Sequence, residues 1–213
     1  MKLLLTAFDP FGGESVNPAQ KAVSLAGEVR GVETVKLTVP TVFGEASRQV
    51  IEAIRREKPN AVLCIGQAGG RAAVTPERVA INLMDARIPD NAGNQPADEP
   101  IVPDAPDAYF ATLPIRKMVE AIRERGIPAE VSNTAGTFVC NEIMYSVLHA
   151  LKTEFPDVIG GFMHVPFILE QAAAKSPVPP SMSLSDIVCA IEAAICAIAK
   201  HLNSEQAERQ KIQ

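Results

Sequence analysis

The sequence predicts a single α/β domain, a three-layer α/β/α sandwich whose twisted sheet is mostly parallel. Apolar strands alternate with amphipathic helices along the chain, and this order is typical of βαβ units. The strands at 2–8 and 61–66 are apolar without alternation, as in strands covered by helices on both faces. A length of 213 residues fits one domain. We place that domain at 1–202, followed by a polar tail at 203–213 that we expect to fray.

Composition excludes several classes of protein. Hydrophobic residues at 47% and charged residues at 21% are typical of a globular protein and exclude global disorder. A net charge of −5 offers no basic surface for nucleic acid. The apolar start of the chain ends at Asp9-Pro10, too early for an export signal, and no apolar run reaches the length of a membrane span. We therefore expect a cytoplasmic protein with no nucleic-acid or membrane partner.

In the first half of the chain, a strand over 2–8 leads into a turn-rich loop over 9–17. Pro18 suits the first position of a helix, which we place at 18–27. An alternating strand is expected over 32–39 and a helix with one apolar face over 43–56. A strand over 61–66 follows, and 74–84 holds a further strand that is interrupted near Pro76.

In the second half, residues 85–108 are rich in Pro, Asp, Asn and Gly. A loop of this length within a compact domain is usually functional, and both a lid and an interface remain open for it. A helix over 114–125, a short strand over 129–132 and a helix over 138–153 follow. A strand over 158–165 and a long apolar helix over 183–202 complete the domain.

Four segments are predicted to meet at the carboxyl edge of the sheet, where parallel α/β folds bind ligands. They are the 9–17 loop, the 67–71 loop, the 133–138 turn and the end of the strand at His164. This placement follows from the order of the elements alone.

Among the four cysteines, Cys140 is the candidate nucleophile. It follows a Thr-Ala-Gly-Thr turn and begins a helix, where free N–H groups and the helix dipole lower the pKa of a thiol. Cys64, Cys189 and Cys196 lie in apolar segments and are expected to be core thiols. The four spacings contain no CxxC, so neither a zinc site nor any other metal or cofactor is predicted.

His164 is the candidate proton acceptor, because a thiol nucleophile usually needs a histidine. His149 lies nine residues after Cys140 on the same helix and faces the opposite way, and His201 lies at the polar end of the last helix. For the acid that orients the imidazole, Glu77, Asp85 and Asp90 all remain open. For Glu77 the ordinary alternative is a solvated salt bridge with Arg78 or Arg71.

With these residues in view, the sequence resembles the pyroglutamyl peptidase I family of cysteine exopeptidases. The resemblance runs from residue 2 to about 200, in blocks that follow the family's order. The blocks are 8–13, Asn17-Pro18, 66–71, 77–82, 85–91, 132–141 and 164–167. The last two blocks, with Cys140 and His164, are the specific ones when taken together.

The resemblance implies a Cys–His–Glu triad that removes N-terminal pyroglutamyl (5-oxoproline) residues from peptides. Carried onto this sequence, it makes Cys140 the nucleophile, His164 the general acid and base, and Glu77 the orienting acid. It implies that Arg87 helps to stabilise the oxyanion. It also implies a lactam pocket lined by Phe8, Phe11, Asn17, Gln67 and Phe138. It also implies a homo-oligomer, either a tetramer or a dimer.

Two other functions remain open from the sequence. The chain could be a thiol amidase of the same fold that acts on another small cyclic or N-blocked amide. It could also be a catalytically silent binder of a small ligand, which an intact set of Cys140, His164 and Glu77 disfavours.

Overall fold

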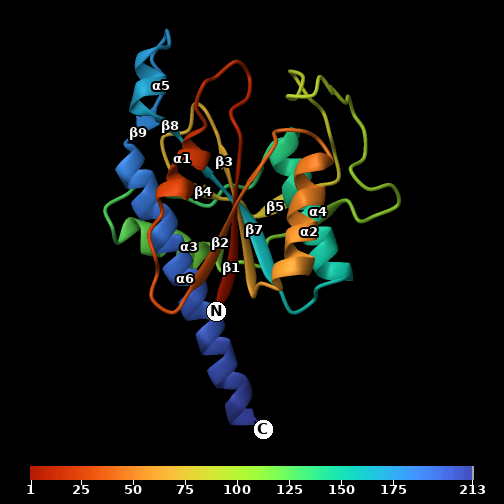
Figure 1. The fold of residues 1–213 in the computed structure, drawn as a ribbon, viewed down its shortest axis with the longest axis vertical. Coiled ribbons are helices and arrows are strands. Elements are labelled where there is room, and N and C mark those ends of the chain that lie inside the picture. The colour runs from red at the N-terminus through yellow and green to blue at the C-terminus, as the bar shows by residue number, and fades with distance from the viewer. Residues whose placement is uncertain (213) are drawn as a thin grey trace.

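The computed structural model describes residues 1–212 and has a mostly parallel sheet at its centre (Figure 1). The strands lie in the order β2 (Glu33–Val39), β1 (Lys2–Phe8), β3 (Ala61–Gln67), β7 (Ile159–Val165) and β4 (Thr75–Pro76). The first four are parallel to one another, and the two-residue β4 pairs antiparallel with β7. The predicted α/β fold with a mixed sheet is confirmed.

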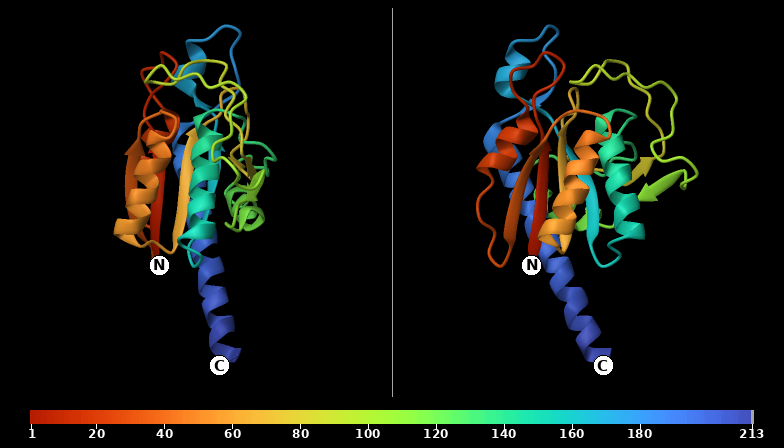
Figure 2. Two further views of the ribbon diagram at one scale, coloured as in Figure 1. Left: turned by 90° about the vertical axis from the view of Figure 1, so that its right-hand side faces the viewer. Right: turned by 45° about the vertical axis from the view of Figure 1, so that its right-hand side comes forward.

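Two layers of helices cover the sheet (Figure 2). On one face lie α1 (Pro18–Leu25), α3 (Ile115–Arg123) and α6 (Leu184–Ile212); on the other lie α2 (Glu45–Glu57) and α4 (Val139–Thr153). Alternate side chains of each central strand enter the two cores, so Leu3 and Leu5 pack on the first layer and Leu4 on the second. Burial on both faces explains why these strands are apolar throughout.

Smaller elements lie at the margins of the sheet. A two-stranded ribbon pairs β5 (Val79–Ile81) with β6 (Ala108–Phe110), and a second pairs β8 (Phe167–Ile168) with β9 (Ser181–Met182). The short helix α5 (Leu169–Ala173) follows β8. Residues between β5 and β6 form the loop that projects beyond α4 in Figure 1.

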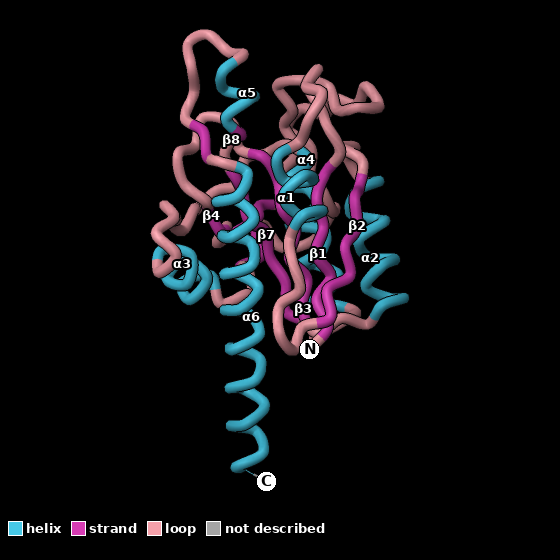
Figure 3. The backbone as a smooth tube through the Cα atoms, turned by 60° about the vertical axis from the view of Figure 1, so that its left-hand side comes forward, coloured by secondary structure: helices cyan, strands magenta, loops and turns pink. Residues whose placement is uncertain are grey.

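Three expected elements differ from the structure. The strand expected within 74–84 becomes β4 and β5 in two separate sheets, because Pro76 lacks the N–H that a continuous strand needs. The strand expected over 129–132 is reduced to isolated bridges at Ala129 and Ser132. The helix expected to end at 202 continues to Ile212, beyond the end of the sheet (Figure 3). The segment after 202 contains no Gly or Pro, and polarity alone does not end a helix.

Candidate active site

The pairing of β7 places His164 at the carboxyl edge of the sheet, between two neighbouring strands. His164 aligns with Gly66 of β3 on one side and with Thr75 of β4 on the other. Glu77 follows β4 directly, and its backbone N–H donates to the carbonyl of Phe162 at 2.9 Å. The strand pairing therefore brings Glu77 beside an imidazole that lies 87 residues away in the sequence.

Glu77 and His164 form a buried pair. His164 Nδ1 lies 2.7 Å from Glu77 Oε1, with His164 3% exposed and Glu77 fully buried. Burial by itself would raise the pKa of Glu77, but the hydrogen bond and charge of His164, with smaller effects of Ser132 and Arg71, outweigh it, so the pKa is lowered. Because an ionised carboxylate only accepts hydrogen bonds, Nδ1 carries the proton and Nε2 is left as the basic nitrogen.

Cys140 is the second residue of α4, at the end of the 133–138 turn. Gly136 allows the turn to take a φ of 80°, and its N–H donates to Thr134 Oγ1 at 3.1 Å. The first N–H groups of a helix have no partner within it, so those of Val139 and Cys140 are available where negative charge would develop on an attacked carbonyl.

Gly66 allows the thiol to approach the sheet closely. A Cβ at this position would lie 3.0 Å from Cys140 Sγ and 2.7 Å from Phe162 Cζ. Gly66 is also the residue that pairs with His164. Side chains alternate along a strand, so position 66 and His164 face the same helical layer, to which α4 belongs. The Cys140 thiol therefore lies over the strand position next to the imidazole.

Burial favours the neutral forms of both reacting groups. It raises the pKa of the Cys140 thiol to about 12, and the negative charge of Glu77 acts in the same direction. Burial also lowers the pKa of His164, which more than offsets the opposing effect of Glu77. A helix N-terminus by itself lowers the pKa of a thiol, whereas desolvation at this site acts in the opposite direction. Proton removal from the thiol therefore depends on a neutral His164.

The other candidate acids are placed elsewhere. Asp90 accepts hydrogen bonds from the backbone N–H groups of Phe43, Ala92 and Asn94, all within 2.8–2.9 Å. Asp85 has an exposed side chain, and its backbone pairs with Thr137. Only Glu77 of these three contacts His164 in the described structure.

His149 does not approach Cys140, as predicted. It lies near the end of α4, where its Nδ1 is 2.9 Å from the hydroxyl of Tyr109.

A cluster of half-buried aromatic rings adjoins the start of α4. The ring centroids of Phe11 and Phe138 are 6.2 Å apart, and Phe43 meets Phe138 edge to face at 5.3 Å. The sequence predicts Phe11 and Phe138 near the thiol, whereas it indicates Phe43 only as the start of a helix. Phe8 is 2% exposed and packs against Phe162, so it belongs to the core beneath this cluster.

Asn17 and Gln67 have internal hydrogen-bond partners. Asn17 Oδ1 caps α1 by accepting from the N–H of Ala19, and its Nδ2 donates to the carbonyl of Asp9. Gln67 Oε1 accepts from Gln171 Nε2 at 3.1 Å. The Asn17 amide therefore shapes the 9–17 loop. Direct contact of either side chain with a substrate stays a prediction.

Arg87 lies on the 85–108 loop with its side chain exposed. It makes no hydrogen bond or ion pair with any residue that the structure describes. Its expected part in stabilising an oxyanion stays a prediction.

All four cysteines are free thiols. Cys64 is buried, and burial raises the pKa of its thiol to about 12. Cys189 and Cys196 are half-buried on α6 rather than fully in the core. Within the described part of the chain, no group of three or more His, Cys, Asp or Glu side chains could hold a metal ion. No helix in residues 1–212 is both long and apolar enough to span a bilayer.

Comparison with known proteins matches residues 1–201 to the family described as pyroglutamyl peptidase. The chain belongs to this family. A pyrrolidone-carboxylate peptidase of Levilactobacillus brevis is 56% identical over 93% of this chain and 97% of its own length. One of Streptococcus pneumoniae is 53% identical over 96% of both chains.

Solved structures show the same fold. The pyroglutamyl peptidase I of Bacillus amyloliquefaciens superimposes with a TM-score of 0.91 at 48% identity, over 94% of this chain and 97% of its own. A mutant pyrrolidone carboxyl peptidase of Pyrococcus furiosus gives a TM-score of 0.91 at 42% identity, over 95% of this chain and all of its own. The fold class and the family predicted from the sequence are confirmed.

Proposed function

We propose that this chain is a cysteine peptidase that removes N-terminal pyroglutamyl residues from peptides. One observation carries the proposal: the buried Glu77–His164 pair lies beside Gly66, over which α4 places the Cys140 thiol. Family membership, with relatives named pyrrolidone-carboxylate peptidase, supports the same substrate class.

In the first step, Cys140 Sγ attacks the carbonyl carbon that joins pyroglutamate to the next residue. His164 Nε2 takes the thiol proton as the S–C bond forms, and Glu77 stabilises the resulting imidazolium through Nδ1. The oxyanion develops near the free N–H groups at the start of α4, with Arg87 as an additional donor. His164 then gives its proton to the departing amine, the C–N bond breaks, and a thioester remains on Cys140.

In the second step, water attacks the thioester. His164 takes a proton from this water, the C–S bond breaks, and the sulfur recovers that proton from the imidazolium. The products are free pyroglutamate and a peptide shortened by one residue. Atoms and charge balance without a cofactor.

The composition of the site suits the lactam ring. Pyroglutamate has no free amine, so its site needs no carboxylate to bind an ammonium group. The half-buried rings of Phe11, Phe43 and Phe138 offer apolar surface that suits a small uncharged ring. Amide groups that pair the lactam N–H and C=O would be left unsatisfied by proline, which would be rejected for that reason.

Steady-state turnover of chromogenic pyroglutamyl, prolyl and N-acetyl amides, with and without a thiol reductant, tests this function. We expect turnover of the pyroglutamyl amide alone, and we expect Cys140→Ser to reduce kcat/KM by roughly 10³-fold or more. Cys196→Ser, at a half-buried thiol on α6, is the matched control and should retain activity.

Three outcomes would contradict the proposal. Preference for the prolyl or N-acetyl amide would favour an amidase of different specificity. Full activity of Cys140→Ser with an unchanged circular dichroism spectrum would exclude Cys140 as the nucleophile. No turnover of any of the three amides by the folded protein would favour a silent binder.

We also propose a cytoplasmic location and a homo-oligomer, either a tetramer or a dimer. The four free thiols are consistent with a reducing compartment, where a thiol nucleophile stays active.

A further inference from the structure

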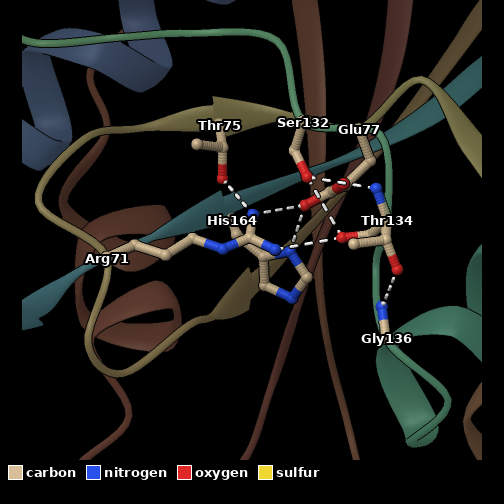
Figure 4. Close-up of polar contacts among 7 residues, drawn as sticks. All are labelled: Arg71, Thr75, Glu77, Ser132, Thr134, Gly136 and His164. Atoms are coloured by element: carbon tan, nitrogen blue, oxygen red, sulfur yellow. Dashed lines mark hydrogen bonds and ion pairs between the residues drawn. The ribbon is translucent and has the colours of Figure 1, made fainter.

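Arg71 ends the Gly-rich segment that follows β3, and its guanidinium reaches three groups at once (Figure 4). Nη1 donates to Glu77 Oε1 at 2.6 Å and to Thr75 Oγ1 at 2.5 Å. Nη2 donates to the backbone carbonyl of Thr134 at 3.0 Å. The sequence offered the Arg71 salt bridge as an alternative to a triad role for Glu77, but the structure contains both interactions.

These contacts link the two halves of the site. Glu77 Oε1 accepts from both Arg71 and His164, so the guanidinium and the imidazole converge on one oxygen atom. Thr134 belongs to the turn that leads into α4, six residues before Cys140. One side chain therefore bonds both the acid that orients the imidazole and the turn that presents the thiol.

We propose that Arg71 is a positioning residue, which holds the Glu77 carboxylate against His164 and fixes the Thr134 turn that presents Cys140. This inference rests on the proposed function of the site. Arg71 acts through its neighbours and has no contact with the reacting atoms in this structure.

The guanidinium suits this role better than an ammonium group would. Its planar fork directs two nitrogens in fixed directions, one toward a carboxylate and one toward a carbonyl. A lysine could supply the charge at Glu77 but has no second rigid arm for Thr134. The Arg71 side chain is 29% exposed while Glu77 is fully buried, so the ion pair forms at the buried end of a partly solvated side chain.

The charge of Arg71 also acts on both reacting groups. The charged and titratable groups around them are Glu77 beside β4, Arg71 after β3, and the Cys64 thiol of β3. Burial lowers the pKa of His164, Glu77 raises it, and the positive charge of Arg71 lowers it further. Burial and Glu77 raise the pKa of Cys140, whereas Arg71 lowers it.

Three variants separate charge, geometry and simple packing. Arg71→Met removes both the fork and the charge, and Arg71→Lys retains only the charge. Arg78→Met is the matched control, because Arg78 Nε donates to Asn133 Oδ1 in the same turn at 2.7 Å but its side chain makes no hydrogen bond or ion pair with Glu77.

The first measurement is kcat and kcat/KM on a chromogenic pyroglutamyl amide as a function of pH. Activity needs neutral His164 and is lost as the pH falls through the pKa of that residue. The acidic limb of the wild-type pH–activity profile should therefore lie below the ordinary histidine pKa of about 6.5. Without the charge of Arg71 the pKa of His164 rises, and the acidic limb of Arg71→Met should move to higher pH.

The same profiles report on geometry. We expect kcat of Arg71→Met to fall on the order of 100-fold, as when a reacting group is misplaced by about 1 Å. Arg71→Lys should restore the acidic limb toward wild type while kcat stays reduced. Arg78→Met should keep both kcat and the limb of the wild type.

Alkylation of Cys140 by iodoacetamide, followed by mass spectrometry of the peptide that contains it, provides a second measurement that needs no turnover. We expect the pH profile of labelling in Arg71→Met to move to higher pH, because the pKa of the Cys140 thiol rises. This arm tests Arg71 even if the wild-type enzyme fails to cleave the pyroglutamyl amide, an outcome that would refute the proposed function alone.

Two results would overturn the proposal. A purely structural role predicts that Arg71→Met lowers the melting temperature but leaves both pH profiles unchanged, with kcat close to wild type. Equal effects of Arg71→Met and Arg78→Met would show that contact with the turn matters and the Glu77 contact does not. If Arg71→Met fails to fold, Arg71→Lys decides: wild-type kcat in that variant contradicts a need for the fork.

Discussion

At the scale of single residues, Glu77 has a buried negative charge that two donors share. His164 Nδ1 and Arg71 Nη1 both approach Oε1, whereas Oε2 has no hydrogen-bond partner among the described residues. Removing one partner of a buried ion pair is usually costly, because the remaining charge stays desolvated. The outcome of a substitution here therefore depends on what the remaining groups can still bond.

We expect Glu77→Gln to cost much less activity than His164→Ala. A Gln carbonyl can occupy the Oε1 position and accept from both donors, so the imidazole keeps its tautomer. The expected loss in kcat is roughly 10- to 100-fold for Glu77→Gln, by analogy with the partners that orient metal-ligating histidines. For His164→Ala it is roughly 10²- to 10⁴-fold, because general acid–base catalysis is lost.

Steady-state kinetics of both variants on the pyroglutamyl amide, with circular dichroism to verify folding, measures the difference. Equal losses in two folded proteins would contradict the separate roles of orientation and proton transfer.

At the scale of elements, the 85–108 loop is held by hydrogen bonds from several residues, among which Asp90 is a buried carboxylate. Asp90 is 6% exposed and accepts from the N–H groups of Phe43, Ala92 and Asn94. The loop is also bonded to the turn before α4, through the backbone and side chain of Thr137 and the backbone of Asp85. Asp90 thereby connects this loop to the segment that positions the Phe43 ring.

We expect Asp90→Asn to loosen the loop and to raise KM more than it lowers kcat. An amide loses the charge and half of the acceptor capacity, leaving a buried N–H unpaired at a cost of about 1–3 kcal/mol. The Phe43 ring then loses its fixed position against Phe138.

Asp98→Asn is the control, since Asp98 is exposed on the same loop. Limited proteolysis and KM for the pyroglutamyl amide measure the effect. Identical cleavage rates and KM values for the two variants would show that Asp90 does not organise the loop.

At the scale of the whole molecule, α6 has two parts with different surroundings. Its first part packs on the sheet through a row of buried residues that includes Ile187, Ile191, Ile195 and Ile198. Beyond Leu202 the helix extends past the sheet, and the residues there whose exposure is described are exposed. The two parts should therefore contribute unequally to stability.

A chain that ends at Leu202 is expected to keep its activity and a melting temperature within about 2 °C of the full chain, since the removed residues whose exposure is described are exposed. Ending the chain at Ala194 also removes Ile195 and Ile198 from the core and should cost about 2–5 kcal/mol for each. Thermal unfolding of the three proteins compares them. A large loss of stability on removing 203–213 alone would mean that this segment has a partner elsewhere, as in an assembly of several copies.

Local sequence patterns were sufficient to predict the central strands and the helix that begins beside Cys140. A continuously apolar segment indicates a strand that is buried on both faces, and a Gly-containing turn followed by an apolar periodic segment indicates the start of α4. The same reasoning excluded His149, because two residues nine apart on one helix face opposite ways. Cys140 and His164 could thus be selected from the sequence as the candidate pair.

The acid could not be selected this way, because three carboxyl groups fitted the pattern equally well. Glu77 reaches His164 through β4, a two-residue antiparallel strand with no periodicity that a sequence pattern could detect. Arg71 and Phe43 join the site for the same reason, through contacts between segments far apart in the chain. The sequence determined the central strands, the main helices and which thiol begins a helix. The tertiary structure decided which charges meet, because strand order and packing bring distant residues together and local propensity does not.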